Sequence, residues 1–473
     1  MRCRRKLFLP FLLCIVIFYC HLWMKLPNRR NKLARSGIYS IESFNGYNFE
    51  MIRSMIRDVF VRNIRIYITE DPHSAKEIID IVNITTNFPT IIDVSKANQL
   101  APEVSKKYVY VHYMFNDQLS MNTRSFLSLC AQAGRSKRYV VKPFVKHTKL
   151  GSDESWLDFE CYYNIDYMKD LLIASNYAGL VNKDEYIREC PAEDPDHVSI
   201  HFIDNSESSK NVLHSKFHVK DDNIRKITAN AYQHGWTECN FLDKAMSRAP
   251  GRQYCVHSAV ITDWKKLEEE IVKEHKCLNV FHWRGIYDDS YRLEFSEDDL
   301  KFTSKDLTYA LRTGIAVENQ VKYVANKFLD SSYIAVYVRG EYILRTRNMD
   351  YLRKCIDMVL NILNLVKEQT HLSRVFVATD MGKYGSSWLV RYQRQKKLDE
   401  NVFNDLIDYI VAQSQAITYI PSSDSVDRGV IALADKKLVA NSQYLITAGN
   451  GTFQEWVEAT FLEYHRYDKR LGP

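Results

Sequence analysis

Short apolar strands alternate with helix-length segments over the last third of this 473-residue chain. Residues 333–341, 375–379 and 444–447 are nearly continuous apolar runs of the kind found in strands buried on both faces. Between the first two runs, Leu352, Ile356, Val359, Leu360 and Leu363 repeat at helical spacing. This alternation predicts an α/β fold in which helices flank a parallel sheet.

The first half of the chain contains a second pattern of the same kind. Residues 108–114 and 139–145 read as strands, and residues 120–133 between them read as a helix that Gly134 closes. A chain of 473 residues exceeds one core of usual size, so we expect two domains with a cleft between them. The predicted boundaries are a tail and anchor at 1–24, a stem at 25–104, and domains at 105–303 and 304–473.

An apolar segment near the amino terminus predicts a membrane anchor. Residues 7–23 carry no formal charge and follow four basic residues at positions 2, 4, 5 and 6. No small-x-small cleavage site follows, which favours an uncleaved anchor over a signal peptide. We therefore expect an anchored protein of the secretory pathway. Both flanks are basic, so the charge rule does not decide orientation, and the expectation of a single-pass type II protein of the Golgi or endoplasmic reticulum membrane with a lumenal body rests on other features of the chain.

Charge and cysteine usage exclude some classes of protein. Residues 1–35 hold nine Lys or Arg and no acid, which leaves 55 basic against 58 acidic residues, so charge argues against nucleic-acid binding. The seven cysteines after the anchor contain no C-x-x-C pair, which disfavours zinc ribbons and redox motifs. In an oxidising lumen up to three disulfides would form, in a pairing that the sequence leaves open.

A glycine-rich turn near the carboxyl terminus predicts an anion site. Residues 443–455 read as a strand, a turn containing Gly449 and Gly451, and a helix start. Glycines let a ligand approach the backbone, and the helix start directs N–H groups and a positive dipole end at it. Thr452 and Glu455 have the spacing of a capping box, and an ordinary capped turn without a ligand is the alternative.

Two polar residues follow neighbouring strand patterns. Arg339 lies where its apolar run ends, and its planar guanidinium suits bidentate contact with phosphate oxygens and a departing diphosphate. The alternative is a surface arginine. Asp380 follows the run 375–379 and would accept hydrogen bonds from a base or ribose, unless it only caps a helix.

Other candidates lie in the first half of the chain. Asn116 and Asp117 follow the first strand of the 108–145 unit, where ligands of open sheets bind, and Asp117 is a candidate general base. A helix cap is an equally good interpretation. Asp194 and Asp196 form a D-x-D sequence that could hold a divalent metal, although a loop is favoured. His197 and the histidine four residues later lie in a strand pattern, about 13 Å apart, and do not form a zinc pair.

Five segments resemble the protein O-fucosyltransferases, which use GDP-fucose. Residues 113–118 and 139–144 resemble the G-x-F-G-N-Q loop and L-x-V-P-P strand of that family, and residues 334–339 resemble its strand ending in H-x-R. Residues 375–380 reproduce its V-F-V-A-T-D strand, and residues 450–453 stand where it has small-Ser-Ser-Phe. The resemblance spans about residues 105–465. The loop lacks its glycines, and Tyr337 replaces the usual histidine.

The resemblance implies a GT-B fold of two facing Rossmann-like domains, with GDP-fucose held by residues 304–473 and the acceptor presented by 105–303. It implies an inverting fucosyltransferase that needs neither metal nor cofactor and acts on a protein or glycan hydroxyl. The implied donor-binding residues are Asn116, Arg339, Asp380, Gly451, Thr452 and Phe453, with Arg339 and Asp117 catalytic. The alternatives are another nucleotide-sugar transferase, assisted by a metal at Asp194 and Asp196, and an inactive lumenal protein that binds nucleotide sugars or glycans.

Overall fold

The structure is a computed structural model. It describes residues 64–68, 92, 106–112, 119–192, 196–203, 210, 213–214, 219–239, 251–261, 264–281, 297, 299–329, 332–383 and 385–468. The chain divides into two compact units, Met1–Phe88 and Pro89–Pro473. The described part of the first unit is strand β1 (Ile64–Ile68). All features below belong to the second unit.

A sheet of seven strands forms the first half of this unit, in the order β7-β3-β2-β11-β8-β10-β9. All neighbouring pairs in it are parallel except β10 and β9. The strands are β2 (Lys107–Val111), β3 (Arg138–Val141), β7 (Leu180–Val181), β8 (His197–Ile203), β9 (Trp236–Glu238), β10 (Arg252–His257) and β11 (Cys277–Val280). The helical segments are α5 (Leu119–Arg135), α6 (Ile165–Ala174), α7 (Lys183–Glu189), α9 (Asp221–His234), α10 (Trp264–Leu267) and the π-helical η5 (Glu268–Val272).

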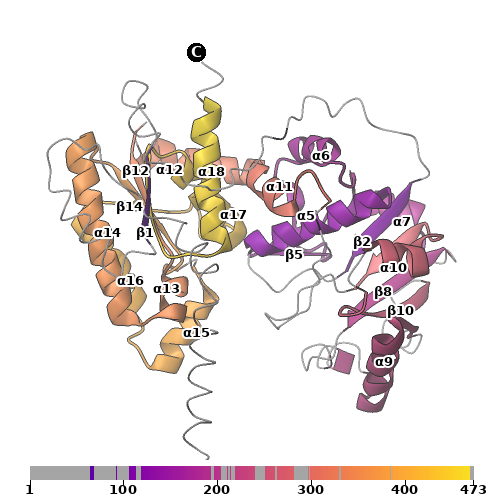
Figure 1. Ribbon diagram of the computed structural model, residues 1–473. Coiled ribbons are helices and arrows are strands. Elements are labelled where there is room, and N and C mark those ends of the chain that lie inside the picture. Colours follow the sequence, from indigo (N-terminus) through magenta and orange to yellow (C-terminus); the bar gives the residue numbers. More distant parts are fainter. Residues whose placement is uncertain are drawn as a thin grey trace, which may run out of the picture. The chain divides into compact units, whose positions relative to one another are not determined.

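The second half contains parallel strands in the order β15-β12-β13-β14. They are β12 (Ile334–Val338), β13 (Val375–Thr379), β14 (Ile417–Thr418) and β15 (Tyr444–Ala448). The helices are α11 (Ser304–Ala310), α12 (Ile315–Phe328), α13 (Gly340–Thr346), α14 (Met349–Thr370), α15 (Ser387–Lys396), α16 (Val402–Ser414), α17 (Arg428–Ala440) and α18 (Thr452–Asp468). Figure 1 shows α14 and α16 on one side of these strands and α17 and α18 on the other.

The predicted α/β class, with parallel strands flanked by helices, is therefore confirmed. One predicted strand is divided. Residues 139–145 were expected to form a single strand, but Pro143 follows β3, and the chain then enters a small antiparallel sheet of β5 (Lys149–Gly151), β4 (Phe144–Lys146) and β6 (Leu157–Asp158). Proline donates no ladder hydrogen bond, which accounts for the break. The 3₁₀ turn η3 (Phe159–Cys161) follows β6.

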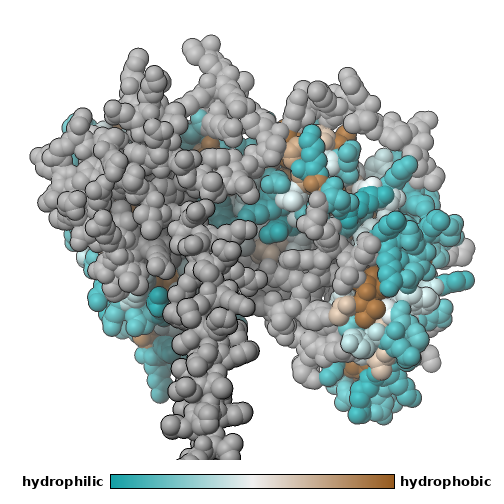
Figure 2. Space-filling model, in the orientation of Figure 1, coloured by the Kyte–Doolittle hydropathy of each residue, from teal (hydrophilic) through white to brown (hydrophobic). Residues whose placement is uncertain are grey.

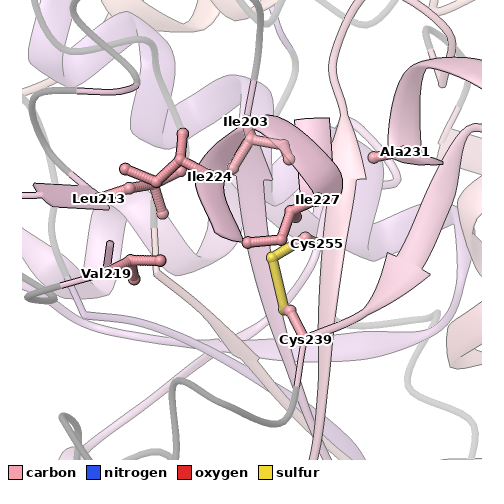
Figure 3. Close-up of a cluster of buried hydrophobic side chains, with 8 residues drawn as sticks. All are labelled: Ile203, Leu213, Val219, Ile224, Ile227, Ala231, Cys239 and Cys255. Atoms are coloured by element: carbon pink, nitrogen blue, oxygen red, sulfur yellow. A yellow bond between two sulfur atoms is a disulfide. The ribbon is translucent and has the colours of Figure 1, made fainter. Parts of the chain in front are cut away.

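Helix α9 shows how an amphipathic sequence builds the core of the first half. Its buried residues Ile224, Ile227 and Ala231 pack with Ile203 and with the disulfide pair Cys239–Cys255 (Figure 3). The surface over α9 is mostly hydrophilic in Figure 2, as expected for the outer face of such a helix.

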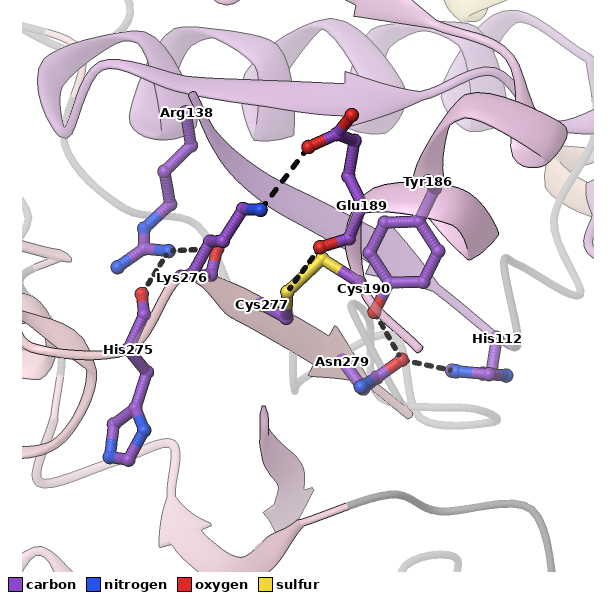
Figure 4. The surroundings of a disulfide bond; sticks show 9 residues. All are labelled: His112, Arg138, Tyr186, Glu189, Cys190, His275, Lys276, Cys277 and Asn279. Atoms are coloured by element: carbon purple, nitrogen blue, oxygen red, sulfur yellow. Dashed lines mark hydrogen bonds and ion pairs between the residues drawn. A yellow bond between two sulfur atoms is a disulfide. The ribbon is translucent and has the colours of Figure 1, made fainter. Parts of the chain in front are cut away.

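A second disulfide joins Cys190, at the end of α7, to Cys277 in β11 (Figure 4). Beside it, the Asn279 side-chain oxygen lies 2.8 Å from His112 Nε2 and accepts from the Tyr186 hydroxyl at 3.0 Å. Burial lowers the pKa of His112 to about 4, so its ring is neutral at physiological pH. These hydrogen bonds link the end of β2, α7 and β11 at the centre of the sheet.

The prediction of a single-pass membrane protein of the Golgi or endoplasmic reticulum is corrected. Spanning a bilayer takes about 20 apolar residues in one helix. Within the described residues, no helix has the length and apolar character that a membrane crossing requires. The predicted anchor at residues 7–23 lies outside the described residues.

Candidate functional site

Three of the predicted site residues meet at one edge of the second sheet. Strands β13, β12 and β15 are adjacent and parallel, so their carboxyl ends share that edge. Arg339 follows β12, Asp380 follows β13, and the glycine turn follows β15. Arg339, Asp380 and Phe453 line one pocket of about 660 Å³.

Arg339 packs directly against the glycine turn. Gly449 and Gly451 have φ values of +119° and +120°, a region in which side chains are rarely tolerated. A Cβ atom at position 451 would lie 2.8 Å from Arg339 Nη1, and one at position 449 would lie 2.8 Å from Arg339 Cβ. The backbone N–H of Arg339 donates to the carbonyl of Ala448 at 2.8 Å. Both glycines are therefore needed for the guanidinium to reach the turn.

The side chain of Asp380 accepts hydrogen bonds from the first N–H groups of α13. Its Oδ1 accepts from the Gly340 N–H at 2.7 Å, its Oδ2 accepts from the Glu341 N–H at 3.2 Å, and Arg339 Nε lies 4.0 Å from Oδ2. Burial raises the pKa of Asp380 to about 7, against the opposing effect of the Arg339 guanidinium. The carboxylate thus caps a helix, although α13 precedes it in the chain, and it also lines the pocket.

The predicted capping box at Thr452 is wrong. Thr452 is the first residue of α18, and the Glu455 N–H donates to the carbonyl of Gly451 at 2.9 Å. Thr452 Oγ1 instead lies 3.1 Å from Ser120 Oγ in α5. The carboxylate of Glu455 pairs with Lys305 at 3.3 Å. Glycine at 451 occupies the position before the helix, so the threonine side chain is displaced toward α5.

Several residues that line the pocket were not predicted from the sequence. Basic side chains from three other segments line the pocket, namely Lys149, Lys383 and Arg428. His147 and Thr148, the two residues between β4 and β5, line it as well. Their positions depend on contacts across the fold, so a pattern of neighbouring residues could not reveal them.

Other predicted residues fall outside the pocket or outside the described residues. Asn116, Asp117 and Asp194 belong to the latter group. His201 lies in β8, where its Nε2 is 2.8 Å from the side-chain oxygen of Gln253. Among the described residues, Cys190, His197 and Cys277 have potential metal-ligand atoms within 4.8 Å of one another, but the two sulfurs are joined in a disulfide. A disulfide offers no thiolate to a metal.

The fold and pocket define an α/β protein whose parallel strands end at a basic pocket. The Gly449–Gly451 turn packs against Arg339 beside it, and Gly451 and Thr452 are not among the lining residues. No protein-family model matches the sequence. No curated protein matches it either.

Solved structures similar to the chain are fucosyltransferases, the enzymes that the sequence motifs resemble. POFUT1 in its apo form is 12% identical, covering 76% of this chain and 96% of that chain, with a TM-score of 0.45. NodZ from Bradyrhizobium is 12% identical over 75% and 92%, with a TM-score of 0.35. FUT1 of Arabidopsis thaliana in complex with GDP is 12% identical over 77% and 71%, with a TM-score of 0.30. Because these scores are below 0.5, the likeness carries no argument about activity.

Proposed function

We propose that the chain is an inverting, metal-independent glycosyltransferase that moves fucose from GDP-fucose to a hydroxyl of a protein or glycan. The observation that carries the proposal is the contact of the Arg339 guanidinium with the Gly449–Gly451 turn at the shared edge of three parallel strands. That arrangement combines a fixed cation with backbone N–H groups at a helix start, which together suit a diphosphate.

The charge of the pocket supports an anionic ligand. Arg339, Lys149, Lys383 and Arg428 line the pocket. Lys383 also forms an ion pair at 3.0 Å with Asp424, a residue that does not line the pocket. A pocket with several cations raises the local concentration of anions and favours their binding.

The acids in the same lining oppose this charge only weakly. Glu341 pairs with Arg345 at 2.5 Å and accepts a hydrogen bond from Ser386. Burial raises the pKa of Asp380 to about 7 and raises that of Asp435 well above its ordinary value. Both carboxyls therefore hold a proton more readily than exposed ones, and the pocket keeps a net positive character.

The proposed reaction is a single displacement at the anomeric carbon. The acceptor oxygen bonds to that carbon while the bond to the β-phosphate oxygen breaks, and GDP leaves with the electron pair. Arg339 stabilises the negative charge that develops on the diphosphate. Gly451, Thr452 and Phe453 form the adjoining donor site, and Asp380 faces the nucleoside. Asn116, which lies outside the described residues, remains an expected donor-binding residue.

The two-domain GT-B arrangement is part of this proposal, with residues 304–473 holding the donor and residues 105–303 presenting the acceptor. The β4–β5 turn of the first half lines the same pocket as Arg339, which supports an acceptor position on that side. The disulfides Cys190–Cys277 and Cys239–Cys255 favour an oxidising compartment for this reaction.

A panel of nucleotide sugars tests the function. We expect GDP-fucose to raise the melting temperature of the purified chain and to release GDP in the presence of an acceptor, equally well with and without EDTA. Arg339→Ala should abolish turnover. Arg353→Ala, which removes an exposed arginine of α14 outside the pocket lining, should leave it unchanged.

The outcomes separate the alternatives. Loss of turnover in EDTA would identify a metal-assisted transferase. Stabilisation by a different nucleotide sugar, and not by GDP-fucose, would identify that sugar nucleotide as the donor. If the chain binds GDP but releases no nucleotide from any nucleotide sugar in the panel, an inactive binding protein is favoured. Full turnover in Arg339→Ala would contradict the proposed role of the guanidinium.

A further inference from the structure

A strained two-residue turn carries His147 into the pocket. His147 and Thr148 connect β4 to β5, and their φ values are 49° and 73°. A two-residue hairpin in which both residues have positive φ normally uses Asn-Gly, and a β-branched threonine is a poor choice there. Strain of this kind persists only where surrounding contacts impose it, and it is concentrated at functional sites.

Contacts from three other segments hold the turn in place. The Asn122 side chain in α5 donates to the Thr148 carbonyl at 3.0 Å, and the Thr148 N–H donates to the Tyr162 hydroxyl at 3.3 Å. The His147 N–H donates to Asp427 Oδ2 at 2.7 Å, although Asp427 lies 280 positions away in the sequence. The backbone of His147 is therefore fixed relative to the start of α17.

The same carboxylate orients the imidazole. Asp427 Oδ2 lies 3.1 Å from His147 Nδ1, and Asp427 Oδ1 accepts from the Tyr162 hydroxyl at 2.5 Å and from the Gly429 N–H at 2.7 Å. The Asp427 side chain is only 8% exposed, whereas that of His147 is 57% exposed. A buried carboxylate at Nδ1 selects the tautomer with its proton on that nitrogen, which leaves Nε2 as an acceptor.

The geometry points to His147 as the general base of the transfer, positioned by Asp427. This inference rests on the proposed transferase function. As the acceptor oxygen bonds to the anomeric carbon and GDP leaves with the electrons of the broken C–O bond, the acceptor proton moves to His147 Nε2. His147 would then carry out the role that the sequence suggested for Asp117, a residue outside the described ones.

Other charged groups lie near the imidazole or line the same pocket. Asp427 faces it from the start of α17, and the Tyr162 hydroxyl reaches the same carboxylate. Lys149 from its own hairpin and Arg428 from α17 line the same pocket. Asp427 therefore lies where it can balance the positive charge that the ring gains on accepting the proton.

The test measures GDP release from GDP-fucose, with water as acceptor and with a panel of oligosaccharides, for the full chain. His147→Gln should lower kcat by about 10²- to 10⁴-fold while the Kd for GDP stays within about twofold. The acidic limb of the wild-type pH profile should disappear in this variant, and added imidazole should restore part of the activity of His147→Ala. His214→Gln is the matched control, because His214 Nδ1 lies 3.7 Å from Asp221 outside the pocket lining.

Asp427→Asn should reduce kcat as well, and circular dichroism shows whether loss of the α17 cap unfolds it. A His147→Gln variant with a wild-type kcat and an intact acidic limb would overturn the inference while leaving the transferase function standing. A wild-type chain that neither binds GDP nor releases it from GDP-fucose would overturn both.

Discussion

At the scale of single residues, the site depends on a close approach between one side chain and one turn. Arg339 Nη1 occupies space that any side chain at position 451 would need. Asp380 adds a second constraint, because its two oxygens accept the first N–H groups of the helix that follows Arg339. The direction of the guanidinium is thus set by the backbone on both sides of it.

Replacing Gly451 with alanine should disturb this contact. The new Cβ would lie 2.8 Å from Arg339 Nη1 at a φ of +120°, so the variant must strain its backbone and move the guanidinium. We expect a loss of at least about 1 kcal/mol in the free energy of unfolding, measured in urea, together with weaker GDP binding. Gly382→Ala is the control, since its Cβ would meet Ile407 at an ordinary 3.5 Å. Equal stability of the two variants would contradict the close packing.

The titration of Asp380 gives a pH-dependent prediction. Its pKa rises from 3.8 to about 7 on folding, so between these values the folded chain binds the proton more tightly than the unfolded chain. This stabilising contribution is complete below pH 3.8 and is lost as the pH rises through 7. The stability of wild type minus that of Asp380→Asn should therefore fall from pH 4 to 8, by at most about 4 kcal/mol. Urea unfolding across that range measures it, and a constant difference would show that Asp380 titrates normally.

At the scale of elements, α17 links the pocket to the core. It begins at Arg428 and Asp427 caps it, while its buried Lys436 lies 4.0 Å from the ring centroid of Trp456 in α18. Burial lowers the pKa of Lys436 to about 7. Burial also raises the pKa of Glu463, which interacts electrostatically with Lys436, to about 7. Lys436 is thus buried where α17 packs against α18, and Glu463 of α18 influences it electrostatically.

Lys436→Met should change how stability depends on pH. The pKa of the lysine falls from 10.5 to about 7 on folding, so between these values the unfolded chain binds more protons, and wild type gains stability as the pH rises. Methionine removes this gain. We expect Lys436→Met to be more stable than wild type near pH 7 and to lose that advantage toward pH 10, by chemical denaturation. An advantage that grows with pH would contradict the burial of a neutral lysine.

The elements also show what the sequence could reveal. The strand predicted at 375–379 coincides with β13, because a continuous apolar run bounded by polar residues suits a strand buried on both faces. The start of α17 carried a readable signal in Asp427, a good N-cap residue before an apolar helix. The β4–β5 turn carried none, since His-Thr is not a typical sequence for two residues with positive φ.

At the scale of the whole second unit, the site combines both halves of the chain. Thr452 contacts Ser120 across 332 positions, and His147 contacts Asp427 across 280. Local periodicity predicts that strands end together at one edge, but it does not specify which distant side chains meet there. The side of the pocket formed by Arg339 and Asp380 was therefore predictable from strand ends, whereas the side carrying His147 required the structure.

The central claim is that Arg339 and the glycine turn bind a nucleotide diphosphate, and calorimetric titration with GDP tests it most directly. Hydrogen bonds to charged groups contribute about 1.5–3 kcal/mol. We therefore expect Arg339→Ala to weaken GDP binding by about 10- to 100-fold, and Arg353→Ala to bind as wild type does. Equal GDP affinity in wild type and Arg339→Ala would contradict the account.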